Sequence, residues 1–239
     1  MKWFLPLGAL LFFCFQCRQI GPPDGGRDSW TSPQPVSSTS VVPPRKVTGP
    51  ATGSSSSLMR SANVRPDMVR KGSYGRRLTV PMSARYITIH STQNYSADAS
   101  RHALALKRGA LRTNQRPGYL IWHYTVDDKV AIQHMPTSEQ GVHADFGGPG
   151  NKYSIGIEMC EHRGCSRAAT IERTAKLTAA LMKQKGIPLK NVVPHYHWPR
   201  RGKNPPNKNC PHFLLDNGKP GKKWRAFLGR VNYYYQQLG

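Results

Sequence analysis

The sequence predicts an α/β protein: a single mixed domain with a central mixed β-sheet flanked by helices, preceded by a disordered tether. Two observations carry this prediction. From about residue 78 onward, short β-rich runs alternate with stretches of helical periodicity, as in a sheet covered by helices. Between about residues 18 and 75, Pro, Ser, Gly and Thr outnumber residues that could form a core. A domain of about 160 residues can bury a full core without staples.

The first half of the domain is expected to contain a strand, a helix and a hairpin. The run RYITIHST (85–92) is β-rich, and SADASRHALALKRGA (96–110) has helical character. We expect Ser96 to be the N-cap of this helix and Gly109 to end it. GYLIWHYTVDDKVAIQHMP contains two β-rich runs joined at DDK, which predicts a hairpin.

The second half is expected to add two strands and two helices. KYSIGIEMCE predicts a strand, and TIERTAKLTAALMKQKG predicts a helix that is capped by Thr170 and terminated by Gly186. NVVPHYH is typical of a short strand that Pro194 halts. The tail KKWRAFLGRVNYYYQQL predicts a helix with an apolar packing stripe. The stripe consists of Trp224, Phe227, Leu228, Val231, Tyr235 and Leu238.

The N-terminal segment predicts export. Residues 1–17 contain one lysine and an apolar run that is too short for a permanent membrane helix but has the length of a signal-peptide core. Cys17 lies at the polar edge of this run, where bacterial lipoproteins carry their lipidated cysteine, although the preceding CFQ departs from the usual small residues. Three alternatives stay open for this segment: lipid anchoring at Cys17, plain cleavage of a signal peptide, and an uncleaved anchor. Residues 18–75 are predicted to be a disordered, basic linker.

The charge balance favours an anionic partner. The chain has 35 Lys+Arg against 12 Asp+Glu, a formal net charge of +23. Such a surface adheres to nucleic acid, anionic lipid or anionic cell-wall polymers, and charge alone does not choose among them. Specific nucleic-acid binding is not expected, because the tail aromatics fall on an apolar stripe rather than among basic residues.

Three residues have the chemistry of metal ligands placed at strand ends. His90 ends the first strand, His195 follows the last short strand, and Cys210 lies in the loop beyond it. Two imidazoles and one thiolate leave the fourth corner of a zinc tetrahedron open, as in catalytic sites. With nine histidines in the chain, spacing alone does not single out this set.

Four motifs in order add weight to the metal hypothesis. ITIHST, WHYTVDDKVAIQHMP, YSIGIEM and KNCPHFLL together resemble the zinc-dependent N-acetylmuramoyl-L-alanine amidase family, which is related to peptidoglycan recognition proteins. The resemblance covers roughly residues 78–215 and implies that residues 76–239 form an amidase catalytic domain. It also implies Zn²⁺ as the cofactor and peptidoglycan as the substrate. The bond cleaved would join N-acetylmuramic acid to the L-alanine of the stem peptide.

The same resemblance implies a role for each site residue. His90, His195 and Cys210 would bind zinc, Glu158 would be the general base, and Lys208 would stabilise the oxyanion. Independently of the resemblance, a carboxylate in the apolar strand SIGIEM needs a partner or a purpose, because burying it unpaired is costly. A salt bridge to a lysine is the alternative reading of Glu158.

The predicted substrate-binding residues are His143, Trp122 and His123. His143, in GVHAD, matches a substrate-groove histidine of relatives, with an exposed loop histidine as the alternative. Trp122 stands where some phage relatives carry a tyrosine. His123 either orients a ligand or fills the core, and Tyr124 is expected to pack.

The loop after the last strand departs from the compact family form. PRRGKNPPN is inserted between the histidine and KNCP, which adds positive charge. His195 is preferred to His197 as the ligand because the family histidine directly follows the short strand, while His197 could support it or be a solvated loop residue.

Two further alternatives stay open. Cys160 and Cys165 either form a disulfide or are free thiols, and a second metal site from these cysteines and His162 is conceivable. A binding module that recognises peptidoglycan without cutting it is the alternative function. Such relatives typically lack the cysteine ligand, whereas this chain has Cys210.

Overall fold

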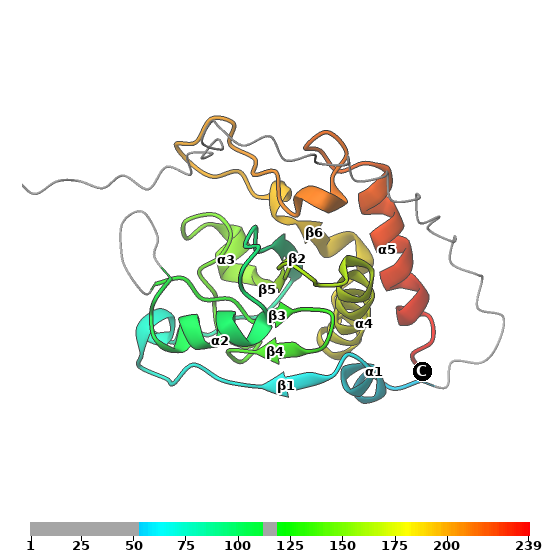
Figure 1. Cartoon of the computed structure of the whole chain (residues 1–239), viewed down its shortest axis with the longest axis horizontal. Coiled ribbons are helices and arrows are strands. Elements are labelled where there is room, and N and C mark those ends of the chain that lie inside the picture. The colour runs from blue at the N-terminus through cyan, green and yellow to red at the C-terminus, as the bar shows by residue number, and fades with distance from the viewer. Residues whose placement is uncertain (1–52, 112–118) are drawn as a thin grey trace, which may run out of the picture. The chain divides into compact units, whose positions relative to one another are not determined.

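A mixed six-stranded sheet forms the centre of the protein in the computed structural model, which describes residues 53–111 and 119–239 (Figure 1). The strand order is β1-β4-β3-β5-β2-β6; β3 and β4 are antiparallel and every other neighbouring pair is parallel. The fold class and the hairpin at DDK are therefore confirmed. The strands are β1 (Val64–Pro66), β2 (Tyr86–Ser91), β3 (Tyr124–Val126), β4 (Ala131–Gln133), β5 (Ser154–Met159) and β6 (Val192–Pro194).

Both faces of the sheet are covered, which explains the apolar composition of its central strands. Ile87 and Ile89 of β2 and Ile157 of β5 are fully buried in the cluster that also holds residues of α4 (Arg167–Lys185) and α5 (Lys222–Tyr235). Figure 1 shows these two helices side by side. The other face packs on α2 (Ala99–Lys107), whose alanines contact Ile132 of β4.

The predicted helices are present, with corrected starts. α2 is capped by Asp98, whose Oδ1 accepts the Arg101 amide at 2.8 Å, so the prediction of Ser96 was wrong. α4 is capped by Ser166, and the predicted cap Thr170 is buried inside the helix. Gly186 ends α4 with φ 65°, as predicted, because glycine adopts this left-handed conformation without steric cost. The buried stripe of α5 is Trp224, Phe227, Val231 and Tyr234; the predicted Leu228 and Tyr235 are half-buried and pack against the same core, whereas Tyr234 was missed.

The domain begins earlier than predicted. Residues 53–75, assigned to the linker, contain α1 (Ser55–Ser61), β1 and the start of a 3₁₀ turn at Tyr74–Arg76. α1 packs on α4, and β1 extends the sheet beside β4. Arg76 then makes a bidentate ion pair with Glu139, at 2.7 and 2.9 Å. Residues 53–75 were assigned to the linker because their composition is mostly polar and only a few apolar residues anchor them to the domain. The predicted signal segment, Cys17 and the linker up to residue 52 lie outside the described residues.

Short elements connect the sheet to the site. α3 (Pro149–Tyr153) precedes β5, and 3₁₀ turns occupy Leu189–Asn191, His195–His197 and His212–Leu214. None of these was predicted, because each is held by tertiary contacts rather than by its own periodicity. Across residues 53–111 and 119–239, no helix has the length and apolarity needed to cross a membrane.

Candidate active site

Parallel strand register brings the predicted functional residues to one edge of the sheet. His90 of β2 lies directly opposite Glu158 of β5. β6 pairs with β2 up to Pro194, so His195 follows at the same edge. The loop after β6 returns to this edge, where the Tyr196 amide donates to the Cys210 carbonyl at 3.0 Å. This closure leaves the inserted segment 199–207, with its prolines, two arginines and one lysine, mostly exposed without displacing the thiol.

The structure groups the three predicted metal ligands. One donor atom each of His90, His195 and Cys210 lies within 4.8 Å of the others, and all three residues are buried. The Ser91 amide donates to Cys210 Sγ at 3.3 Å and fixes the thiol beside β2. His197 is exposed instead, with its ring against Tyr86 and Trp198.

Hydrogen bonds to carbonyls fix which nitrogen of each imidazole carries its proton. His195 Nε2 lies 2.8 Å from the Ala144 carbonyl and must donate to it. His143 Nε2 likewise faces the Ser154 carbonyl at 3.3 Å, so His143 Nδ1 accepts from His90 Nε2 at 3.0 Å. The Nδ1 atoms of His90 and His195 are then both bare, and they face each other at 2.9 Å. Two lone pairs at this distance repel unless a cation lies between them.

The electrostatics suit a metal ion. Burial and the neighbouring His195 hold the pKa of His90 well below its usual value, and burial lowers the pKa of His195 to about 3. Neutral imidazole is the form that binds metal. Burial and the Glu158 carboxylate raise the pKa of Cys210 to about 12, so the thiol keeps its proton until a cation displaces it. A His₂Cys set with an open position is one that catalytic zinc uses.

Glu158 lies beside His90 at the edge of the cluster of metal-ligand candidates. Its Oε1 lies 3.8 Å from His90 Nδ1, and its buried Oε2 has no hydrogen-bond partner in the part of the chain that the structure describes. Burial raises the pKa of Glu158 to about 7, with Lys208 opposing the shift and Glu161 adding to it. Lys208 is half-buried, and its charge also lowers the pKa of His90 and His195. The charge of Lys208 therefore acts on both candidate histidine ligands and on Glu158.

The structure does not support the predicted substrate-binding roles of Trp122 and His123. His123 is fully buried: its Nε2 donates to the Glu139 carbonyl and its Nδ1 accepts the Gly156 amide. Trp122 is also buried, and its indole N–H donates to Thr125 Oγ1 at 2.7 Å. Both side chains have their hydrogen-bond partners inside the core, and His123 fills the core, which is the alternative that the sequence left open. Tyr124 is part of the core, as predicted.

His143 is a support for the site rather than a groove residue. Its ring is buried behind His90 with both nitrogens engaged. Gly156 makes room for it, because a Cβ there would come within 2.8 Å of the ring. Asn151 Oδ1 accepts the backbone amides of His143 and Ala144, which aims the Ala144 carbonyl at His195. Asn151 and Gly156 were missed. For Asn151 the available signal was HADFGGPGN, which has an amide side chain in a glycine-rich turn; for Gly156 it was the glycine inside the apolar strand SIGIEM.

A second group missed by the sequence borders Cys210. Glu161 accepts the Gln93 amide at 2.6 Å and lies 3.3 Å from His212 Nε2. His212 Nδ1 is in turn 3.3 Å from Ser91 Oγ. These contacts fasten the segment after Cys210 to the end of β2.

Comparisons with known proteins agree with this geometry. Residues 80–213 match the N-acetylmuramoyl-L-alanine amidase family. The chain belongs to this family. It is 39% identical over 155 residues to the N-acetylmuramoyl-L-alanine amidase CwlH of Bacillus subtilis, covering 63% of this chain and 54% of CwlH. It is 39% identical over 159 residues to XlyA of the same organism, covering 65% of this chain and 49% of XlyA. The chain thus spans about half the length of these curated relatives.

The fold of this amidase-family chain is similar to that of solved structures of relatives. The catalytic domain of XlyA matches with a TM-score of 0.59 and 37% identity, over 71% of this chain and 99% of that domain. A mutant endolysin from Bacillus subtilis matches with a TM-score of 0.60 and 37% identity, over 71% of this chain and 98% of the endolysin chain.

Proposed function

We propose that the chain is a peptidoglycan hydrolase that cleaves the amide bond between N-acetylmuramic acid and the L-alanine of the stem peptide. The observation that carries this proposal is the pair of bare Nδ1 atoms of His90 and His195 beside Cys210 Sγ, with the Glu158 carboxylate at their edge. Membership of the amidase family supports the choice of bond.

The residues that would hold Zn²⁺ are His90, His195 and Cys210. Zinc bound there would polarise the amide carbonyl and make water a nucleophile near neutral pH. The Ala144 and His143 contacts hold both imidazoles in the tautomer that leaves Nδ1 free for the metal.

Glu158 takes the proton from the attacking water and delivers it to the departing amine. Its raised pKa places it near neutrality, where a carboxyl both accepts and releases a proton readily. Lys208 supplies positive charge where the tetrahedral oxyanion develops. Because the site is walled by buried groups, this charge is weakly screened.

Location and adhesion form part of the proposal. An exported protein meets peptidoglycan, and a net charge of +23 favours adhesion to anionic wall polymers. Anchoring through Cys17 would keep the domain at a membrane surface. Sedimentation with purified sacculi at rising salt tests the adhesion, which we expect to weaken because exposed charges are screened.

The experiment that tests the function is digestion of purified sacculi by the zinc-loaded protein, followed by mass spectrometry of the fragments. We expect glycan strands stripped of peptide and stem peptides with a free L-alanine amine. Binding to sacculi without release of these products would instead establish the alternative, a non-catalytic recognition module.

A further inference from the structure

A second set of metal-binding donors lies outside the active site. Asp128 is in the turn between β3 and β4, and His162 and Cys165 are in the loop between β5 and α4. One donor atom of each lies within 4.8 Å of the other two, as in the active-site set. We propose that Asp128, His162 and Cys165 form a second site for a divalent cation of the zinc class.

The contacts within this cluster fit a cation. Cys165 Sγ lies 3.5 Å from Asp128 Oδ1 and donates to it, so the thiol and the carboxylate already point at each other. The Ser166 amide holds Asp128 Oδ2 at 3.2 Å and orients the carboxylate. His162 Nδ1 is buried and has no hydrogen-bond partner among the described residues. A buried ring nitrogen without a partner is costly, and a bound cation removes this cost if that nitrogen is the ligand.

The carboxylate of this cluster is ready to bind. Burial disfavours its charge, but the hydrogen bonds from the Ser166 amide and the Cys165 thiol outweigh this and hold the pKa of Asp128 below its usual value. Binding would replace the thiol proton with the metal, so the thiolate, carboxylate and imidazole would meet at one ion.

The geometry separates Cys165 from the other nearby thiol. Both Cys160 and Cys165 are free, so the disulfide left open by the sequence is not formed. Cys160 is buried, and its Sγ lies 3.9 Å from His102 Nδ1 instead. Burial also raises the pKa of the Cys160 thiol well above its usual value, so this thiol stays protonated. The conceivable set of two cysteines and His162 is therefore replaced by one in which Asp128 takes the place of Cys160.

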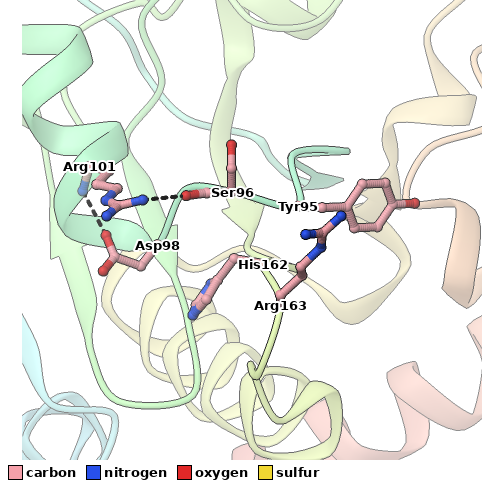
Figure 2. A pocket seen from close by; sticks show the side chains of 6 residues that line it. All are labelled: Tyr95, Ser96, Asp98, Arg101, His162 and Arg163. Carbon is pink, nitrogen blue, oxygen red and sulfur yellow. Dashed lines mark hydrogen bonds between the residues drawn. The ribbon is translucent and has the colours of Figure 1, made fainter. Parts of the chain in front are cut away.

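The cluster is reachable from solvent. Asp128, His162 and Cys165 are all half-buried. His162 also lines a pocket of about 670 Å³, shown in Figure 2. The other residues that line it are Tyr95, Ser96, Asp98, Arg101 and Arg163. A metal can enter, and water can complete its coordination.

The donor types set the class of metal. One nitrogen, one sulfur and one oxygen suit Zn²⁺ or Co²⁺, whereas Ca²⁺ and Mg²⁺ need oxygen ligands. Bound metal would tie the β3–β4 turn to the start of α4. This inference does not depend on the proposed amidase activity.

The test uses Co²⁺ as an optical probe in the full chain with reduced thiols. Cys210→Ser removes the active-site thiolate. The metal-free variant should still show a thiolate-to-cobalt charge-transfer band when Co²⁺ is added. Adding Cys165→Ser should abolish the band, while Cys160→Ser, the matched control, should leave it intact. His162→Ala should weaken Co²⁺ binding at least about tenfold, since even losing a group that only supports a ligand costs this much.

A second measurement tests the proposal even if the Cys210→Ser variant folds poorly, because it uses the wild type and the Cys165→Ser variant. Calorimetric titration with Zn²⁺ should give two equivalents per wild-type chain and one per Cys165→Ser chain. A single equivalent in the wild type, or a charge-transfer band that survives Cys165→Ser, would overturn the proposal.

Discussion

Glu158→Gln should stabilise the metal-free protein while disabling it. Glu158 is half-buried, its Oε2 is buried without a hydrogen-bond partner among the described residues, and its pKa is raised from 4.5 to about 7. Glutamine keeps the size and polarity of the side chain but never ionises. The variant therefore removes only the cost of holding a buried negative charge.

The sign and size of the effect follow from proton linkage. Below pH 4.5 the carboxyl is protonated in both the folded and unfolded states, so the two proteins should differ little. Between 4.5 and about 7 the unfolded chain ionises first, and the wild type loses stability as pH rises. At about 1.4 kcal/mol per pKa unit, the loss reaches on the order of 3 kcal/mol by pH 8.

The assay is urea denaturation of chelator-treated wild type and Glu158→Gln from pH 4 to pH 8. We expect the variant to be more stable at pH 8 and the difference to vanish near pH 4. A difference independent of pH, or a wild type that is more stable at pH 8, would refute the burial argument. In the zinc-loaded variant, loss of the base should lower the hydrolysis rate by about 10²–10⁴.

Three further predictions address the metal, the oxyanion and the domain boundary. Lys208→Ala should lower the hydrolysis rate by about 10²–10³ without changing zinc content, as measured on soluble muropeptides; an unchanged rate would remove Lys208 from the mechanism. Cys210→Ser should lose one equivalent of zinc in calorimetry and Cys160→Ser none, because among the described cysteines only Cys210 has its thiol with His90 and His195. A chain starting at residue 76 should melt at a lower temperature than one starting at residue 53, because it lacks α1 and β1; equal melting temperatures would restore the predicted boundary at residue 76.

Local patterns predicted the fold well where strands and helices carry their own periodicity. β2, β5, α4 and α5 were found because buried strands and amphipathic helices have strong signals. The segment 53–75 was missed because its folding depends on distant partners: α1 packs on α4, and β1 pairs with β4. The helix N-caps were misplaced by a few residues because several Ser, Thr and Asp residues stand near each helix start.

The site residues also divide into those that local sequence patterns predicted and those that depend on tertiary packing. His90, His195, Cys210 and Glu158 lie at the ends of predicted strands or in the following loop, so the sheet edge brings them together. Core filling was one of the two alternatives predicted for His123, whereas the burial of Trp122 and the hydrogen bonds of both side chains were not predicted. Asp128 could not be grouped with Cys165 from the sequence, because 37 residues separate them and only the packing of two loops joins them.

The most direct test of the proposed mechanism is the release of L-alanine amine from purified sacculi by zinc-loaded wild type and Glu158→Gln in parallel. We predict that the wild type releases amine in proportion to muramic acid freed of peptide, and that Glu158→Gln binds the sacculi equally but releases at least about a hundredfold less. Equal release by both proteins would contradict the role of Glu158. Reducing sugar released without amine would contradict amide cleavage itself.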